Sequence, residues 1–304
     1  MKIIRAEEMG MCFGVRDALQ IADEVARPAD VTVYGELVHN PVVNHRLSKA
    51  GFHQSRENGR KPNVTTPLVL ITAHGISDKE RNELQANNKQ LIDTTCPLVQ
   101  RAHEAAFDLR DEGRLVLVIG KSGHVEVQGI TGDLPRFEVI STIEDVRRFD
   151  SDQLGVISQT TMPMEQVSEI HAEIRRQNPN ADIRFIDTVC RPTKLRQQAM
   201  LDLLKRVDAV VAVGGMNSNN TRRLVNLCHE HGKPGYHVEN AEQLKTEWFS
   251  DVKVVGLTAG TSTLDETIDE VQRALERMGS PVSVGLASPT SSLQSESRSG
   301  CVGN

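Results

Sequence analysis

Short apolar runs rich in valine and isoleucine alternate with longer amphipathic stretches along most of the chain. Buried strands of parallel sheets are typically continuous apolar runs, and the connection between two parallel strands usually contains a helix. The alternation therefore predicts an α/β fold with parallel sheets. The predicted strands lie in the segments VTVYG, PLVLITAHG, RLVLVIG, QLGVISQ, ADIRFIDT, DAVVAVGG and VKVVGLTAG.

Two of these segments lead into nearly identical sequences, LIDTTCP at residues 91–97 and FIDTVCRP at residues 185–192. We expect each strand to end at the Asp-Thr step. A helix should begin just past each cysteine, because Pro97 and Pro192 suit the first helical turn and apolar residues then recur at helical spacing. The N-terminal segment has the same order, with KIIRA, then MGMCFG, then a helical apolar stripe. The three strand-to-helix junctions carry Cys12, Cys96 and Cys190.

Successive junction cysteines are separated by on the order of 90 residues, about the length of a small α/β domain. This spacing predicts a threefold internal repeat. Parallel-strand folds bind ligands at the carboxyl ends of their strands, so the three cysteine loops should face one centre. The predicted lobes cover residues 14–96, 97–190 and 191–279, with residues 1–13 completing the third lobe. The Ser-rich segment 280–304 is predicted to be a disordered tail.

Composition and charge narrow the possible partners and location. The chain has 304 residues, more than one hydrophobic core usually serves, and it is 38% hydrophobic, which is typical of a globular protein. Its net charge of −6 argues against a nucleic-acid or membrane surface. No apolar run approaches the roughly 18 residues of a membrane span. Glu7 and Glu8 lie where a secretory signal needs an apolar core, so the cytoplasm is the expected compartment.

Five cysteines in a cytoplasmic chain of this length do not indicate a disulfide framework. A thiolate at a helix N-terminus is stabilised by the local positive potential, which lowers the thiol pKa and suits metal binding. The alternative is that these cysteines are small buried hydrophobic residues. The absence of Cys-x-x-Cys pairs disfavours structural zinc, and three soft ligands from three lobes favour an iron-sulfur cluster with one iron left open. Cys228 is expected in the core and Cys301 in the tail.

Histidines follow several predicted strands. ELVHNPVV carries His39, TAHGIS carries His74, and GKSGHVEVQG carries His124 and Glu126. Each histidine alone is more often solvated or a helix cap, and Glu126 alone resembles a surface carboxylate. Together they predict an anion held by imidazoles, with a proton donor close by.

Polar residues at other strand ends predict loops that bind phosphate. In VVAVGGMNSNNTRR, hydroxyl and carboxamide side chains precede a helix whose N-terminal amides suit an anion. The loop lacks the glycine spacings of dinucleotide and nucleoside triphosphate sites. Each loop taken singly is equally an ordinary helix cap. The candidate residues are Ser218, Asn219, Asn220, Ser262, Thr160 and Thr161.

Nine short motifs between about residues 2 and 278 together resemble the hydroxymethylbutenyl diphosphate reductase family. They are MCFGV, LVHNP, AHGIS, DTTCP, GHVEV, SQTT, DTVC, NSNNT and TAGTS, in the order of the family. The resemblance implies three α/β lobes with pseudo-threefold symmetry around a 4Fe-4S cluster. It further implies that the cluster is held by Cys12, Cys96 and Cys190 and keeps one open iron, which takes the substrate's allylic hydroxyl.

The resemblance also implies an activity, the reduction of (E)-4-hydroxy-3-methylbut-2-enyl diphosphate to isopentenyl and dimethylallyl diphosphate. This is the last step of the methylerythritol phosphate route to isoprenoids. Glu126 would protonate the departing hydroxyl, with Thr160 and His124 ordering the proton relay. An external ferredoxin or flavodoxin would supply two electrons. The implied diphosphate contacts are His39, His74, His124, Thr160, Ser218, Asn219, Asn220 and Ser262.

Three departures from the family pattern and two rival functions follow from the same residues. Val125 replaces the usual proline before the glutamate, Asn219 replaces a serine, and the sequence after the third cysteine reads Arg-Pro-Thr. The change at Asn219 puts the contact of that side chain in doubt. One rival is an iron-sulfur sensor that keeps the three cysteines but reduces nothing. The other is a metal-free protein that binds a diphosphate or transfers a group from it, which would leave the junction cysteines unexplained.

Overall fold

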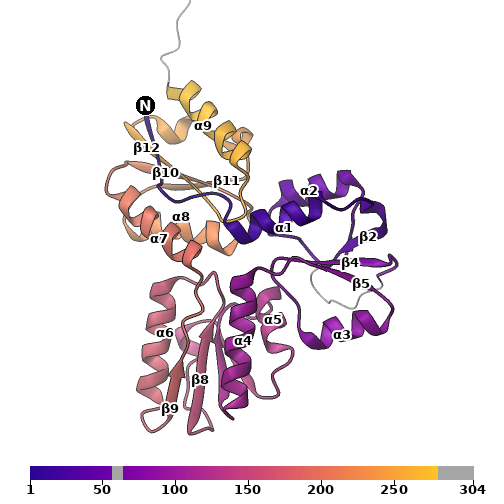
Figure 1. The fold of residues 1–304 in the computed structure, drawn as a ribbon. Helices are drawn as coiled ribbons and strands as arrows, with labels where there is room; N and C mark the ends of the chain where they lie inside the picture. Colours follow the sequence, from indigo (N-terminus) through magenta and orange to yellow (C-terminus); the bar gives the residue numbers. More distant parts are fainter. Residues whose placement is uncertain (57–63, 280–304) are drawn as a thin grey trace, which may run out of the picture.

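The computed structural model describes residues 1–56 and 64–279, except for the side chain of Asn219. The predicted tail, with Cys301, lies outside the described residues. The described chain forms three separate four-stranded sheets, and every strand pair in them is parallel. Figure 1 shows the sheets as three lobes, each with its own helices, meeting at a common centre. The predicted α/β class with parallel sheets in three lobes is confirmed.

The first lobe has the strand order β3-β2-β4-β5. Apolar residues of α1 and α2 pack on one face of this sheet, and Leu84 of α3 lies in the cluster on the other face. The elements are α1 (Phe13–Asp23), a short 3-10 turn η1 (Pro28–Asp30), β2 (Val31–Val33), α2 (Pro41–Ala50), β3 (His53–Gln54), β4 (Leu68–Ile71), α3 (Asp78–Ala86) and β5 (Gln90–Asp93).

The second lobe repeats this arrangement with the order β7-β6-β8-β9. Helices α4 and α5 cover one face and α6 covers the other. The elements are α4 (Pro97–Asp111), β6 (Leu115–Ile119), α5 (Val125–Thr131), β7 (Phe137–Ile140), the turn η2 (Ile143–Asp145), β8 (Gln153–Ser158), α6 (Met164–Gln177) and β9 (Asp182–Phe185).

The third lobe has the order β1-β12-β10-β11, so the first strand of the chain completes the last sheet. In Figure 1 the indigo N-terminal strand accordingly lies among orange and yellow elements. Helices α7 and α8 pack on one face and α9 on the other. The elements are β1 (Lys2–Arg5), α7 (Arg191–Leu204), β10 (Ala209–Val213), α8 (Asn219–Glu230), β11 (Gly235–Val238), the turns η3 (Ala241–Gln243) and η4 (Thr246–Phe249), β12 (Val254–Ala259) and α9 (Asp265–Gly279).

The three sheets place equivalent loops at equivalent positions. The central pairs are β2 with β4, β6 with β8, and β10 with β12, and each pair is the point where the strand order reverses. Ligands of open parallel sheets bind at such a point, beyond the carboxyl ends of the strands. The edge strands β5, β9 and β1 lie next to these pairs, and each leads into a junction cysteine. The repeated strand order therefore places the loops that carry the cysteines and the other candidate site residues at the inner end of each lobe.

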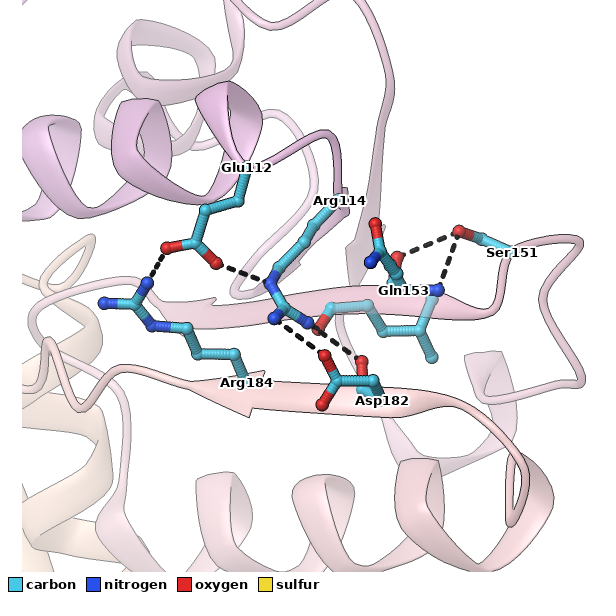
Figure 2. Close-up of polar contacts among 7 residues, drawn as sticks. Glu112, Arg114, Ser151, Gln153, Asp182 and Arg184 are labelled. Carbon is cyan, nitrogen blue, oxygen red and sulfur yellow. Dashed lines mark hydrogen bonds and ion pairs between the residues drawn. The ribbon is translucent and has the colours of Figure 1, made fainter.

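Charged side chains hold together the opposite end of the second sheet. Figure 2 shows Arg114 between two carboxylates, with Nε 2.7 Å from Glu112 and Nη2 2.8 Å from Asp182. Glu112 also pairs with Arg184. These ion pairs lie at the amino ends of β6 and β9, away from the loops that carry the cysteines.

No helix among the described residues is both long and apolar enough to span a bilayer.

Candidate active site

The inner ends of the three lobes surround an open cavity, in which the space not filled by atoms is about 720 Å³ including its solvent-filled mouth. It is lined by every predicted site residue whose side chain the structure describes: Cys12, Cys96, Cys190, His39, His74, His124, Glu126, Thr160, Ser218, Asn220 and Ser262. The side chain of Asn219 lies outside the described residues, although its backbone begins α8.

Each junction cysteine is the N-cap residue of a helix. Cys12 precedes α1, Cys96 precedes α4 and Cys190 precedes α7, and none of the three uses its side chain to cap the helix. Serine, threonine, aspartate and asparagine are the usual residues at this position, because their oxygens accept from the first turn. All three thiols are free and partly exposed, so their sulfurs remain available to the cavity.

The backbone fixes all three cysteines by the same contact. The N–H of Cys12 donates to Thr261 O at 3.0 Å, that of Cys96 to Ala73 O at 3.1 Å, and that of Cys190 to Thr160 O at 2.9 Å. The acceptors follow β12, β4 and β8, the neighbours of the three edge strands. Each cysteine is thereby tied to the loop that begins at the central strand next to its own edge strand.

The repeated Asp-Thr step shapes the turn before two of the cysteines. Asp93 Oδ1 accepts from the N–H of Thr95 at 2.9 Å, and Asp187 Oδ1 accepts from the N–H of Val189 at 3.1 Å. Thr94 and Thr188 donate their hydroxyls to carbonyls at the ends of β4 and β8. The strand β5 ends at Asp93 as predicted, but β9 ends at Phe185, two residues before Asp187. In the second repeat the aspartate therefore belongs to the turn alone.

Burial reverses the predicted direction of two thiol pKa values. Amides at the start of α4 lower the pKa of Cys96, as the sequence argument expects, but burial raises it by more. Burial likewise raises the pKa of Cys190 to about 11, against the lowering effect of its contacts with Thr193. The prediction of lowered thiol pKa values is therefore wrong for these two residues. Binding of a cation at the sulfurs must displace their protons.

Three imidazoles gather on the wall formed by the first and second lobes. The rings of His39 and His74 stack with centroids 4.3 Å apart, and the ring of His124 lies 5.2 Å from the first and 5.8 Å from the second. His124 Nδ1 accepts from the N–H of Glu126 at 3.1 Å, which in the neutral form leaves the ring proton on Nε2. Such a cluster can present several N–H donors to one anion.

Glu126 lies in the first turn of α5 and is 2% exposed. Burial raises its pKa, and hydrogen bonds from Thr160 together with the charge of His39 lower it in part. The bond from the backbone N–H of Thr160 to Glu126 Oε1 measures 2.6 Å. A buried carboxyl with a raised pKa can hold a proton near neutral pH and deliver it inside the cavity.

The third lobe contributes polar side chains at two helix starts. Ser218 caps α8 by accepting from the N–H of Thr221 at 3.3 Å. Asn220 is 4% exposed, and its Nδ2 has no hydrogen-bond partner within the described part of the chain. A buried donor without a partner is costly, so this amide points to a ligand that accepts hydrogen bonds. Ser262 completes the group at the end of the β12 loop.

Two residues that support the site were missed by the sequence argument. Asn40 donates to Ser262 O at 2.6 Å, and the hydroxyl of Ser262 donates to His39 O at 3.3 Å, so the first and third lobes are joined beside the histidines. The Asn-Pro step before α2 is a recognisable helix start, and the side chain of Asn40 caps that helix. The bond from Asn40 to Ser262, in contrast, depends on how the lobes pack. Thr193, fully buried, lies with its Oγ1 3.1 Å from Cys190 Sγ.

The cysteines fit an iron-sulfur cluster better than a single ion. Gly14 leaves room for a sulfur, because a Cβ built on it would lie 2.4 Å from Cys96 Sγ. No group of three histidine, cysteine or acidic side chains in the described ranges is placed to hold one metal ion. A cluster does not require this, because each cysteine binds a different iron. Cys228 is fully buried in the core of the third lobe, as expected, and burial raises its pKa to about 12.

The fold and the cavity together define a class of protein, a three-lobed α/β protein with a central site lined by three free cysteines and by loops that carry histidine, serine, threonine and asparagine side chains. The chain belongs to the LytB protein family, whose model matches residues 3–276. The predicted resemblance is confirmed.

Named relatives and solved structures agree with this assignment. The 4-hydroxy-3-methylbut-2-enyl diphosphate reductase of Aquifex aeolicus is 36% identical and covers 91% of this chain and 96% of its own. That of Geotalea daltonii is 37% identical and covers 91% and 97%. A solved structure titled as the terminal enzyme of the non-mevalonate pathway is 35% identical, with a TM-score of 0.65, and covers 91% and 99%. The corresponding reductase of Plasmodium falciparum is 24% identical, with a TM-score of 0.83 and coverage of 92% and 89%, and supports the fold.

Proposed function

We propose that this protein is a 4-hydroxy-3-methylbut-2-enyl diphosphate reductase. The observation that carries the proposal is the meeting of three free thiols, three imidazoles and the buried acid Glu126 in one cavity. The reaction adds two electrons and two protons to the allylic alcohol, breaks its C–O bond and releases water. The products are isopentenyl and dimethylallyl diphosphate, which differ in the carbon that receives the second proton.

Cys12, Cys96 and Cys190 would hold an iron-sulfur cluster of the 4Fe-4S type. When bound, such a cluster supplies electrons one at a time and a Lewis-acidic iron for the hydroxyl of the substrate. The protein fixes the three cysteines through their backbone N–H groups and keeps the sulfurs at the cavity. An external donor of the ferredoxin or flavodoxin type would provide the electrons.

The diphosphate would bind between the imidazoles and the third lobe. His39, His74 and His124 would donate from one side, and the cap of α8 from the other. The supporting observation is the buried, unpartnered Nδ2 of Asn220. Ser218, Ser262 and the backbone at Asn219 would complete the contacts, because amides and hydroxyls at a helix start suit an anion.

Glu126 would deliver the proton that lets the hydroxyl leave as water. A carboxylic acid is suited to this role because water is a better leaving group than hydroxide. Thr160 would hold the carboxyl through its backbone N–H, and His124 would fix the start of α5 by accepting from the N–H of Glu126. This buried acid favours a reductase over an iron-sulfur sensor, which has no use for a proton donor beside its cluster.

Anaerobic purification, iron and sulfide analysis and an assay with a reduced viologen dye test the proposal. The wild-type protein should be brown and should convert the diphosphate substrate. Cys96→Ser should lose both the colour and the turnover, whereas Cys228→Ala, outside the cavity, should keep both. A colourless protein with full activity would refute the assignment.

A further inference from the structure

Arg196 is a buried cation without an acidic partner. It lies on α7 and is 4% exposed, and no carboxylate of residues 1–56 or 64–279 forms an ion pair with it. Arginine is almost never buried this deeply unless it is paired. The proposed mechanism gives this residue no role. We therefore expect a negative charge close to its guanidinium.

The guanidinium joins the Cys12 loop to the first turn of α7, the helix that follows Cys190. Its Nε and Nη2 donate to Gly10 O at 3.2 and 2.7 Å, and its Nη1 donates to Pro192 O at 3.0 Å. Gly10 lies two residues before Cys12, and Pro192 two residues after Cys190. Gly10 has φ +73°, a left-handed conformation that glycine adopts without strain. The side chain thus fixes the Cys12 loop to the start of the helix that Cys190 caps.

The titratable groups that face Arg196 are Cys12, Glu8, Cys190 and Arg16. Glu8 is exposed, so water screens its charge, whereas Cys12 and Cys190 lie at the cavity. Charges interact more strongly where water is excluded. The natural countercharge for this guanidinium is therefore the pair of cysteine sulfurs once a bound metal has displaced their protons.

We propose that Arg196 is a positioning residue that supplies this positive charge and thereby raises the reduction potential of an iron-sulfur cluster bound at Cys12 and Cys190. The inference rests on the proposed function, because it requires these sulfurs to hold such a cluster. Each electron that enters the cluster adds negative charge, and a fixed cation nearby stabilises the reduced state. Hydrogen bonds to the carbonyls of Gly10 and Pro192 keep the cation in place.

Arg114 provides a matched control elsewhere in the fold. Its side chain is 12% exposed, and it too donates to backbone carbonyls, Leu154 O at 3.4 Å and Asp182 O at 3.0 Å. It differs in having two carboxylate partners, Glu112 and Asp182, at the far end of the second sheet (Figure 2). Neutralising Arg114 disturbs the packing of a largely covered arginine without removing a charge beside the cysteines.

The experiment compares Arg196→Gln, Arg196→Lys and Arg114→Gln with the wild type. Each protein is reconstituted anaerobically, its iron and sulfide are measured, and its midpoint potential is determined by titration with dithionite and mediators, monitored by electron paramagnetic resonance. Arg196→Gln should weaken reduction about tenfold or more, a negative shift of about 59 mV for one electron. Arg196→Lys should stay near the wild-type potential, and Arg114→Gln should match it.

The possible outcomes separate the inference from the proposed function. An unchanged potential in Arg196→Gln, or an equal shift in Arg114→Gln, overturns the role of Arg196 while leaving the reductase intact. If Arg196→Gln retains no cluster, retention by Arg196→Lys supports the need for charge, and loss by both variants overturns it. A wild-type protein that binds no iron after reconstitution overturns both.

Discussion

The backbone N–H of Thr160 donates to Glu126 Oε1 at 2.6 Å, and the carbonyl of the same residue accepts from the N–H of Cys190 at 2.9 Å. One peptide segment after β8 therefore positions both the proposed proton donor and a proposed cluster ligand. Such double use couples the position of the Glu126 carboxyl to that of the Cys190 backbone. Proton transfer requires this precision, because its rate depends on close contact in a defined direction.

Glu126→Gln should lower turnover by roughly 10²- to 10⁴-fold, the usual contribution of a positioned acid. The amide keeps the shape of the side chain but cannot deliver the proton. Turnover is measured anaerobically with a reduced viologen dye, and iron content and substrate affinity are expected to stay near wild type. Glu169→Gln, on the exposed side of α6, is the control and should keep full activity. If Glu126→Gln kept near-normal turnover, another group would have to donate the proton to the departing hydroxyl.

The raised pKa of Glu126 predicts how stability changes with pH. Because burial raises this pKa from the ordinary value of 4.5, the folded state binds the proton more tightly than the unfolded chain. The contribution of Glu126 to the free energy of unfolding is therefore greatest below pH 4.5 and falls as the pH rises through the folded-state pKa. Glu126→Gln removes this dependence. Relative to that variant, the wild type should lose stability as the pH rises.

Urea unfolding of cluster-free, reduced protein at about pH 5 and about pH 8 measures this difference. The same pair of measurements on Glu169→Gln, a substitution on the exposed side of α6, serves as the control for replacing a glutamate by glutamine. A difference between wild type and Glu126→Gln that stays constant with pH would mean that Glu126 ionises in the folded state as it does in the unfolded chain.

Much of the site was predictable because its residues lie at strand ends. The apolar runs place the strands, and parallel strands bring their carboxyl ends to one side, so Cys12, Cys96 and Cys190 were expected to face one centre. The pKa values of Cys96 and Cys190 were not predictable, because burial depends on how the lobes pack and outweighs the effect of the helix N-terminus. The contact between Arg196 and Gly10 joins positions 186 residues apart, and no local pattern encodes it.

Gly14→Ala should reduce the iron content of the reconstituted protein severalfold. The added Cβ would lie 2.4 Å from Cys96 Sγ, and the backbone of Cys96 is held by Ala73 O, so the sulfur must move. Metal sites tolerate displacements of only about 0.5 Å. Iron and sulfide analysis after anaerobic reconstitution measures the loss.

Gly129→Ala is the matched control for this change. Gly129 also lies in a helix, α5, but its added Cβ would come no closer than 3.5 Å to another side chain, that of His103. It should keep the iron and gain roughly 0.4–1 kcal/mol in free energy of unfolding, because alanine favours the helix. Equal iron in both variants would show that the space at Gly14 is not needed by the sulfur.

Asn220→Ala should weaken diphosphate binding about 10- to 100-fold, the effect of losing one hydrogen bond to a charged group. The stability of the free protein should not fall with this loss of affinity. Because Nδ2 of Asn220 is buried without a partner in the described chain, its removal should leave the free energy of unfolding of the free protein unchanged or higher. Calorimetric titration with the substrate measures the affinity, and urea unfolding measures the stability.

Asn226→Ala, a substitution at an exposed position of the same helix, is the control and should change neither quantity. If Asn220→Ala destabilised the free protein and left affinity unchanged, the amide would be a structural group and the diphosphate would have to bind elsewhere in the cavity.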